Sequence, residues 1–392
     1  MNTKQLKLLA DIQTGPFGSQ LHKEDYVAVG TPIVTVEHLG NRVFAEQNLP
    51  MVSDNDKERL NKYVLREGDI VFSRVGSVDR CSYVDAAHDG WMFSGRCLRV
   101  RPNEHLDAMY LYYYFCLEET KQFVRNIAVG ATMPSINTKL LGEVPIAFPS
   151  VEQQARVAQL LSTIDDKIEN NGKINDNLYE MVNAYYTSLF KDVECEMTTI
   201  GNYAERIYSG GTPTTSNAAY WDGAFGWFSS GETRNRFVIS TEKTITQAGI
   251  DNSSTKLAAK HDIVMASAGQ GFTRGQTSML LIDTYVNQSV IVIHAERKVL
   301  PYLFWNLANR YEELRAISDS SSIRGSLTTK MIAAFEIPLA NEESLQAFAD
   351  FSWSVIPQIE NNLLENERLA ALRDNLLPKL MSGDIDVSNI QL

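Results

Sequence analysis

Polar and basic side chains recur in short turn segments in both halves of this 392-residue sequence. Arginine can donate two hydrogen bonds to guanine, asparagine and glutamine can pair with adenine, and serine or threonine can bind either bases or phosphates. Residues of these types on turns could therefore contact a polar partner. Any one of them could instead cap a turn or face solvent, so the hypothesis concerns the set. The candidate contacts are Thr14, Ser19, Gln20, Ser73, Arg74, Ser77, Arg80, Ser94, Arg96, Thr132, Ser135 and Asn137 in the first half, and Ser209, Thr212, Thr214, Ser267, Gln270, Arg274, Asn287, Gln288, Ser322 and Arg324 in the second.

The sequence lacks the common signatures of catalysis and metal binding. It contains no GxxxxGK[ST] phosphate loop, no GxSxG nucleophile elbow and no HExxH zinc motif. The glycine-rich segment Gly269-Gln270-Gly271 has Arg274 where a dinucleotide loop needs its third glycine, which favours a β-turn. The four cysteines show no CxxC spacing, and the six histidines complete no ligand set. We therefore expect no catalytic residue, metal or bound cofactor in this chain.

The acidic charge is concentrated in two short segments. The formal net charge is −12, which at first argues against a nucleic-acid partner. Residues 1–149 carry 16 basic against 18 acidic residues, and residues 198–340 carry 13 against 12. The excess acid lies in residues 150–197 and 341–392, with 4 basic against 9 acidic and 3 against 9. The two large segments are thus nearly neutral, and we expect them to depend on partner proteins for part of any phosphate contact.

The sequence contains two copies of one plan. Asp69-Ile70-Val71 recurs as Asp262-Ile263-Val264, 193 residues later. Apolar alternation predicts strands at these segments, and amphipathic spacing predicts helices that begin near Tyr110 and Tyr302. Six matches in the same order indicate a duplicated unit. The other five are 93–94 and 97–100 with 286–287 and 290–293, 110–111 with 302–303, Lys139 with Lys330, 144–146 with 337–339, and 168–171 with 359–362.

Each copy consists of a mixed region of strands and short helices followed by a long helix of about 40 residues. Ser150 with Gln153 forms a capping box at the start of the first long helix. Asn341 is the predicted cap of the second, and Gly383 its predicted end. A helix of this length spans about 60 Å.

Both long helices carry a seven-residue apolar pattern with two asparagines at its middle. Asparagine at such a position lowers stability but penalises shifted registers, because a displaced amide faces aliphatic side chains. The matching polar layers predict that the helices pair with each other, and an antiparallel pairing would relate the two halves by a pseudo-twofold axis. The alternative is that each helix packs only on its own domain. The predicted helix-pairing residues are Ile164, Ile168, Asn171, Asn175, Leu178, Val355, Ile359, Asn362, Asn366 and Leu369.

Two residues depart from an ideal coiled coil. Pro357 inside the second helix should kink or interrupt it, at a cost of about 3 kcal/mol. Gly172 should weaken the first helix by about 1 kcal/mol relative to alanine.

Segments spread over nearly the whole chain resemble the specificity subunits of type I restriction–modification systems. Residues 145–149 running into 152–157 and 164–169 are similar to the central conserved region of that family. Residues 377–385 are similar to its distal conserved region, and Gly15–Ser19 and Ser209–Pro213 resemble the starts of its target-recognition domains. Pro357 and residues 341–344 depart from the family pattern.

The resemblance implies an α+β fold, with two similar mixed α/β target-recognition domains joined by two long helices in an antiparallel coiled coil. The expected divisions are residues 1–149, 150–191, 192–340 and 341–392. Such a subunit reads bipartite double-stranded DNA without catalysing a reaction, in the cytoplasm of a prokaryote. It binds two methyltransferase subunits and motor-nuclease subunits, which would carry S-adenosylmethionine, ATP and Mg. The alternatives are the specificity subunit of a fused, type II-like enzyme and a coiled-coil scaffold that binds no DNA.

Overall fold

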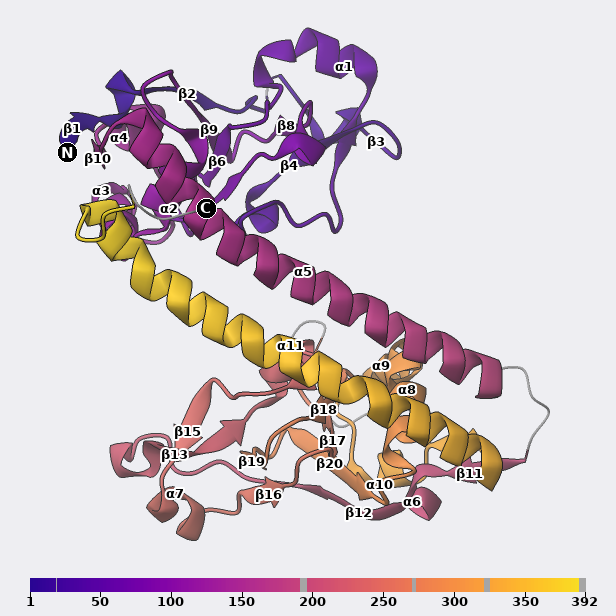
Figure 1. Ribbon diagram of the computed structural model, residues 1–392. Helices are drawn as coiled ribbons and strands as arrows, with labels where there is room; N and C mark the ends of the chain where they lie inside the picture. The colour runs from indigo at the N-terminus through magenta and orange to yellow at the C-terminus, as the bar shows by residue number, and fades with distance from the viewer. Residues whose placement is uncertain (19, 191–195, 270–272, 321–324, 388–392) are drawn as a thin grey trace. The chain divides into compact units, whose positions relative to one another are not determined.

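The computed structural model describes residues 1–18, 20–190, 196–269, 273–320 and 325–387 (Figure 1). The chain forms two units, one from Met1–Lys167 together with the segment from Arg368 onward, and the other from Ile168–Glu367. Two long helices, α5 (Val151–Phe190) and α11 (Glu342–Ser382), contribute residues to both units. The helices and strands are mixed within each unit, which confirms the predicted α+β class.

The first unit is built on three small sheets. The largest has the strand order β2-β9-β6-β7 and is antiparallel, the second has the order β3-β5-β4-β8 with β4 parallel to β8, and β1 pairs with β10. The helix α2 packs against the first sheet, with Phe72 of β6 in edge-on contact with Phe115. The strands are β1 (Asn2–Gln5), β2 (Ala10–Thr14), β3 (Tyr26–Val27), β4 (Thr31–Val34), β5 (Met51–Val52), β6 (Ile70–Ser73), β7 (Cys81–Tyr83), β8 (Met92–Phe93), β9 (Cys97–Pro102) and β10 (Pro145–Phe148). The α-helices are α1 (Asp54–Arg59), α2 (Ala108–Cys116), α3 (Glu118–Ile127) and α4 (Thr138–Gly142).

The second unit repeats this arrangement with one added strand. Its main sheet has the order β12-β20-β17-β18-β14, its second sheet the order β15-β13-β19-β16 with β13 parallel to β19, and β11 pairs with β21. The strands are β11 (Met197–Thr199), β12 (Ala204–Ser209), β13 (Trp221–Phe228), β14 (Phe237–Val238), β15 (Lys243–Ile245), β16 (Lys256–Ala258), β17 (Ile263–Ala266), β18 (Thr277–Leu280), β19 (Thr284–Val286), β20 (Val290–Ala295) and β21 (Glu336–Pro338). The α-helices are α6 (Ile200–Tyr203), α7 (Gln247–Asp251), α8 (Leu300–Asn309), α9 (Tyr311–Ser320) and α10 (Thr329–Ala333).

The duplication extends to individual buried polar contacts. Asp69 accepts from the backbone N–H of Arg66 and pairs with Arg101, and Asp262 accepts from Ala259 and pairs with His294. Both carboxylates are almost fully buried at the start of the central strand of the main sheet. A buried carboxylate is tolerated only when it is hydrogen-bonded and paired, so each unit meets the same requirement with a different partner side chain.

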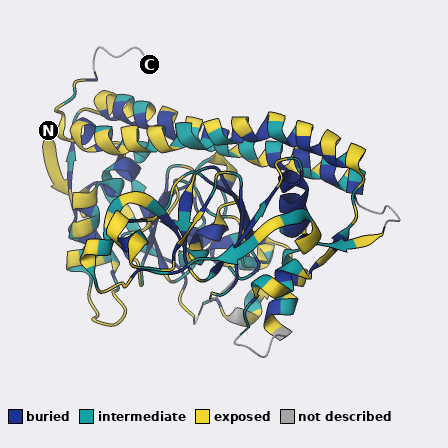
Figure 2. Cartoon of the chain, turned by 90° about the horizontal axis from the view of Figure 1, so that it is seen from below, coloured by how far each residue is buried: buried dark blue, intermediate teal, exposed yellow. Residues whose placement is uncertain are grey.

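Both long helices begin at the predicted caps, and α11 ends at the predicted glycine. The Ser150 hydroxyl accepts from the backbone N–H of Gln153, and Asn341 Oδ1 accepts from that of Ser344 at 2.8 Å. After α11, Gly383 adopts a φ of +82°, which is strained for residues with a Cβ. Buried and exposed residues alternate along both helices (Figure 2), as the seven-residue pattern predicts.

The asparagine layers of the two helices bind each other within the second unit. Asn171 Nδ2 donates to Asn366 Oδ1 at 2.9 Å, and Asn362 Nδ2 donates to Asn175 Oδ1 at 2.8 Å. Residue numbers rise along one helix as they fall along the other, so the pairing is antiparallel. In the first unit the helices meet through Arg373, whose Nη1 donates to the buried Asp165 at 2.7 Å.

The sequence predicted that Pro357 would kink or interrupt the second helix. The prediction of an interruption is wrong. The helix α11 is continuous from Glu342 to Ser382. Pro357 is exposed, so water can reach the carbonyl group that loses its N–H donor, while its neighbours Val355 and Ile356 remain buried. Gly172 likewise lies within an unbroken α5.

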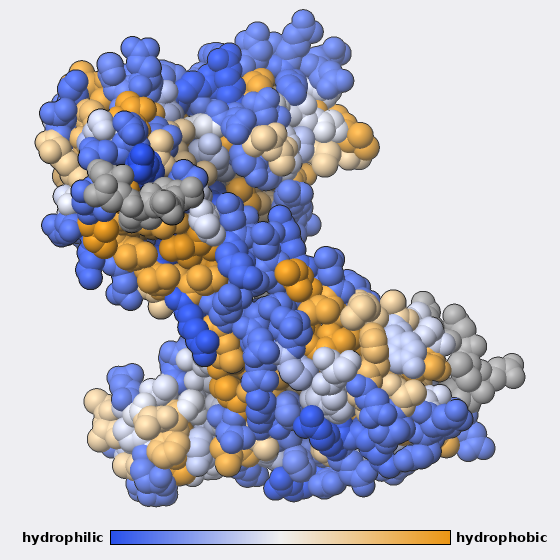
Figure 3. Space-filling view, viewed as in Figure 1, coloured by the Kyte–Doolittle hydropathy of each residue, from blue (hydrophilic) through white to orange (hydrophobic). Residues whose placement is uncertain are grey.

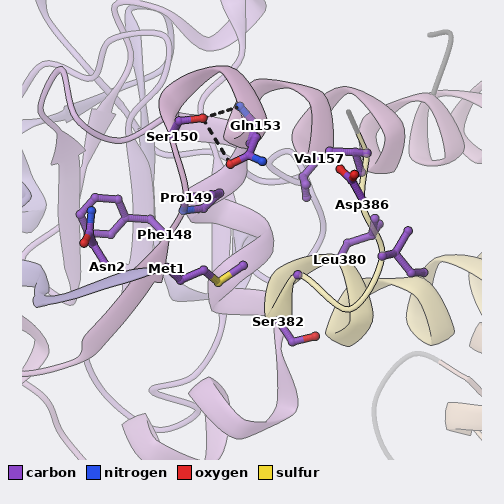
Figure 4. A pocket seen from close by; sticks show the side chains of 13 residues that line it. Met1, Asn2, Phe148, Pro149, Ser150, Gln153, Val157, Leu380, Ser382 and Asp386 are labelled. Carbon is purple, nitrogen blue, oxygen red and sulfur yellow. Dashed lines mark hydrogen bonds between the residues drawn. The ribbon is translucent and has the colours of Figure 1, made fainter. Parts of the chain in front are cut away.

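The two ends of the chain's first unit meet beside the start of α5. Figure 4 shows a pocket of about 590 Å³ there, lined by Met1 and Asn2, by Ser150 and Gln153, and by the end of α11 with the segment that follows it. Elsewhere in the first unit, the surface over α1 is hydrophilic (Figure 3). All residues of that helix are polar or charged, and none of them is buried.

The asparagine pair predicts a specific response to mutation. Replacing Asn362 alone with leucine leaves the Asn175 amide facing an aliphatic side chain, and we expect a loss of about 1–3 kcal/mol in the free energy of unfolding. Replacing both residues with leucine should restore most of that loss. Urea unfolding followed by far-UV circular dichroism measures both variants. Equal destabilisation by the single and double replacements would show that the two amides do not depend on each other.

Candidate nucleic-acid interface

Three turns of the first unit are joined by backbone hydrogen bonds. The N–H of Arg74, after β6, donates to the carbonyl of Arg96, which precedes β9, at 2.8 Å. The carbonyl of Arg74 accepts from the N–H of Ile136, in the loop before α4, at 2.9 Å. The main chain of residue 74 therefore holds two other predicted contact segments in place without using any side chain.

The second unit contains the same backbone frame. The N–H of Ser267 donates to the carbonyl of Ser289 at 2.9 Å, and its carbonyl accepts from the N–H of Leu327 at 2.9 Å. These residues lie 193, 193 and 191 positions after their counterparts in the first unit, the same offsets as in the sequence repeat. We call these two sets of joined turns the recognition frames.

A fourth turn packs against each frame through glycine. A Cβ atom on Gly15 would lie 2.2 Å from the carbonyl oxygen of Ser94, and one on Gly210 would lie 1.9 Å from that of Val286. No side chain fits at such distances, so these glycines allow the backbone of the turn to approach the frame. This explains why both halves begin with a glycine-containing turn.

The side chains carried by the two frames differ. In the first unit Arg74 Nη1 donates to the carbonyl of Gly95 at 3.0 Å, and its guanidinium lies over the ring of Phe17 at 5.4 Å. Its Nε is buried without an acceptor among the described atoms. The matching residue of the second unit is Ser267, which is buried. One backbone arrangement thus presents different hydrogen-bonding groups in the two units.

In the first unit, the predicted contacts divide into exposed and engaged residues. Ser77, Arg80, Arg96 and Thr132 are exposed. The engaged side chains bind other groups of the same unit. Ser73 donates to the carbonyl of Val75, Ser94 contacts Cys97, and Ser135 donates to the carbonyl of Val129. Asn137 caps α4, Gln20 accepts from Tyr63, and Thr14 is half-buried at the end of β2. The exposed residues are free to meet a partner, whereas the engaged ones shape the turns.

The second unit shows the same division. Thr214 and Gln288 are exposed, Gln288 accepts from Thr212, and Ser209 is half-buried. Asn287 accepts from the N–H of Ser289 at 2.9 Å and is buried. Arg274 Nη2 pairs with Asp319 at 2.6 Å, and Nη1 donates to the carbonyl of Gly325, so this guanidinium braces α9. Ser19, Gln270, Ser322 and Arg324 lie outside the described residues.

Sequence reasoning missed an apolar part of this surface. Phe17 lies in the first predicted turn and is 52% exposed. Met133 lies in the loop before α4, which is bonded to Arg74 through Ile136, and is 64% exposed. Phe17 lines a pocket of about 530 Å³ together with Tyr26 and Arg96. The available signal was an aromatic residue between Pro16 and Gly18, where a turn leaves a large side chain little to pack against.

The described residues contain no set of groups for metal binding and no activated nucleophile at the frames. No cluster of three or more His, Cys, Asp or Glu side chains could hold an ion in the described ranges. Burial raises the pKa of the Cys97 thiol to about 12, so the sulfur stays protonated at neutral pH. Both frames carry hydrogen-bonding groups, and the first also carries the arginines Arg74 and Arg96. Among the described helices none has the length and apolarity needed to cross a membrane.

The chain matches the model of the type I restriction modification DNA specificity domain twice, over residues 1–180 and 193–367. Because the matches cover most of the sequence, the chain belongs to this family.

The chain is also similar to named relatives, and it shares its fold with a solved structure. The chain is similar to the specificity subunit of the type I restriction enzyme HindI from Haemophilus influenzae, with 20% identity over 83% of this chain and 88% of the relative. It is also similar to the MjaIX specificity subunit from Methanocaldococcus jannaschii, with 20% identity over 99% and 94%. The type I S subunit structure from M. genitalium shares the fold, with a TM-score of 0.60 and 17% identity over 97% of this chain and 95% of that one.

The glycine contact gives a test with an internal control. A Gly15→Ala variant forces a Cβ into the carbonyl of Ser94, and we expect thermal or urea unfolding of the first unit at clearly milder conditions, with a loss of about 1–3 kcal/mol. Gly18→Ala is the matched control, because a Cβ atom added there would meet nothing within 4 Å. Equal stability of the two variants would contradict the close approach.

Proposed function

We propose that this chain recognises a bipartite DNA sequence, with each recognition frame reading one half. One observation carries the proposal: the two units share a backbone frame while presenting different side chains on it. Readout of bases requires side chains that vary on a main chain that does not, because each base pair presents its own pattern of donors and acceptors. Family membership favours this reading over a scaffold that binds no DNA.

In this proposal the chain contributes recognition, and partner subunits contribute chemistry. Two methyltransferase subunits would dock on the long helices, and motor-nuclease subunits would join them to cut unmodified DNA. S-adenosylmethionine, ATP and Mg would bind to those partners. The acidic excess on residues 150–197 and 341–392 supports a protein rather than a DNA partner for the helices, since like charge disfavours contact with phosphate.

Mapping of methylated bases tests the proposal directly. Genomic DNA from cells that express the chain with its neighbouring methyltransferase should carry methyl groups at two short sequences separated by a spacer of fixed length and arbitrary sequence. Cells that express the methyltransferase without this chain provide the control. A single uninterrupted methylated site, or methylation that does not depend on this chain, would reject the proposal.

Exposed Arg96 should act on one half-site only. We expect Arg96→Ala, in the assembled complex, to weaken binding of duplexes that carry the half-site of the first unit by about 1–3 kcal/mol, roughly 5- to 150-fold, because one base or phosphate contact is lost. Electrophoretic mobility shift with duplexes altered in either half measures the effect.

Thr214→Ala is the comparison variant in the second unit, and its effect should appear on the other half-site. Size-exclusion chromatography establishes that both variants assemble. Equal losses on both half-sites for Arg96→Ala would argue against a local contact.

A further inference from the structure

A cationic pocket lies beside the recognition frame of the second unit. Its volume is about 480 Å³, and Arg206, Ile207, Tyr208, Lys256 and Leu257 line it. Arg206 and Tyr208 lie two residues apart on β12, and Lys256 begins β16. None of these five residues belongs to the predicted contact set.

The tyrosine is fixed between the two cations. Its hydroxyl donates to the carbonyl of Leu257 at 2.8 Å, which joins β12 to β16. Arg206 Cζ lies 5.8 Å and Lys256 Nζ 5.6 Å from the centre of its ring, within the range of cation–π attraction. The ring therefore holds two positive groups close to one opening.

Neither cation is neutralised by a carboxylate among the described residues. The nearest acid in sequence, Glu205, lies 3.5 Å from His294 instead. The buried Asp262 already accepts from Ala259 and pairs with His294. Most other arginines and lysines of the same unit, such as Lys260 with Glu360, are in ion pairs, so two unpaired cations at one pocket are a local feature.

The matching residues of the first unit carry no such pair of cations. Strand register aligns Arg206 and Tyr208 with Asp11 and Gln13, because their partners on β20 and β9 are equivalent. Asp11 is an acid and is paired with Arg99. The residue 193 positions before Lys256 is Tyr63, which is buried and donates to Gln20. The positive charge at these positions is thus specific to the second unit.

The pocket adjoins the turns of the recognition frame. Tyr208 and Ser209 end β12, and the chain then enters the glycine turn, where the N–H of Gly211 donates to the carbonyl of Val286 at 3.1 Å. Thr255, directly before Lys256, donates to the same carbonyl at 3.0 Å. Asn287 and Gln288 of the frame follow Val286. A duplex that meets the frame would bring its sugar–phosphate backbone to this edge.

We propose that Arg206 and Lys256 bind a phosphodiester group of the DNA backbone next to the half-site of the second unit. The inference rests on the proposed function and adds a contact that carries no base information. Two unpaired cations at one opening suit a single negative charge shared by two oxygens, and both can donate to it. This contact then adds to the salt dependence with which the second half-site is held.

Salt dependence of binding tests the site. The assembled complex with its methyltransferase is titrated with the duplex identified by methylation mapping, at KCl concentrations between about 50 and 200 mM. We expect the double variant Arg206→Gln/Lys256→Gln to reduce the slope of log K against log salt by about 0.9, because one phosphate is no longer neutralised. Each single variant should reduce the slope by part of that amount. Lys4→Gln, which removes one exposed charge from β1, a strand that belongs to neither a frame nor a long helix, is the matched control and should leave the slope unchanged.

Two further measurements distinguish loss of a phosphate contact from misfolding of the variants. They also distinguish it from a failure of the chain to recognise DNA at all. The charge-conserving pair Arg206→Lys and Lys256→Arg should retain the wild-type slope. Phosphate-ethylation interference should mark phosphates beside the second half-site in the wild type and lose that mark in the double variant. An unchanged slope, or interference confined to the first half-site, overturns the inference while leaving DNA recognition intact. A wild-type complex that does not retain the duplex overturns the proposed function and the inference with it.

Discussion

The hydrogen bonds that join the turns through the main chain of Arg74 and Ser267 are the constraint on which each unit depends. Buried backbone groups must be paired, and here they pair with other turns instead of with side chains. Because the frame uses only main-chain atoms and the close approach of a glycine, replacing a side chain on it need not change its shape. A protein that must present different surfaces from one fold requires this independence of frame and side chain.

Each unit is attached to its own segment of long helix by polar contacts. In the first unit Arg42 donates to Asp166 at 2.5 Å and to the carbonyl of Ser162 on α5. In the second unit Arg236 donates to Asp176 at 3.2 Å and stacks over Tyr179 at 4.3 Å. Side-chain pairs of this kind contribute little stability where exposed, but two donors from one guanidinium restrict the orientation of the surface they hold. Directional contacts complement the apolar cores, whose attraction has no preferred orientation.

The repeat made much of the fold predictable. Fixed offsets located both central strands and both helices predicted near Tyr110 and Tyr302, which begin two residues earlier, at Ala108 and Leu300. The helix caps were also predictable, because each depends on local chemistry. The antiparallel asparagine pairs followed from their matching places in the two helices. Pro357 was misjudged because helix propensity describes an isolated helix, whereas burial of its neighbours holds this one together.

The candidate surface was less predictable than the fold. Residue type does not distinguish Arg96, which is exposed, from Arg274, whose guanidinium binds Asp319 and the carbonyl of Gly325. The partners of Arg274 lie 45 and 51 residues away in the sequence, so its engagement is not visible there. The pocket of Arg206 and Lys256 depends on two strands brought together by a tyrosine hydroxyl, and no spacing within the sequence encodes that meeting.

Net charge was also a poor guide, for a related physical reason. A phosphate responds to charges within roughly a Debye length, about 8–10 Å in physiological salt, and not to the sum over the chain. Pairing removes most cations of the second unit from that count, as it does for Lys260 and Arg310. What remains at the pocket is positive although the chain carries −12. An acidic protein can therefore hold a polyanion where its cations are left unpaired, and its acidic helices are then suited to protein partners.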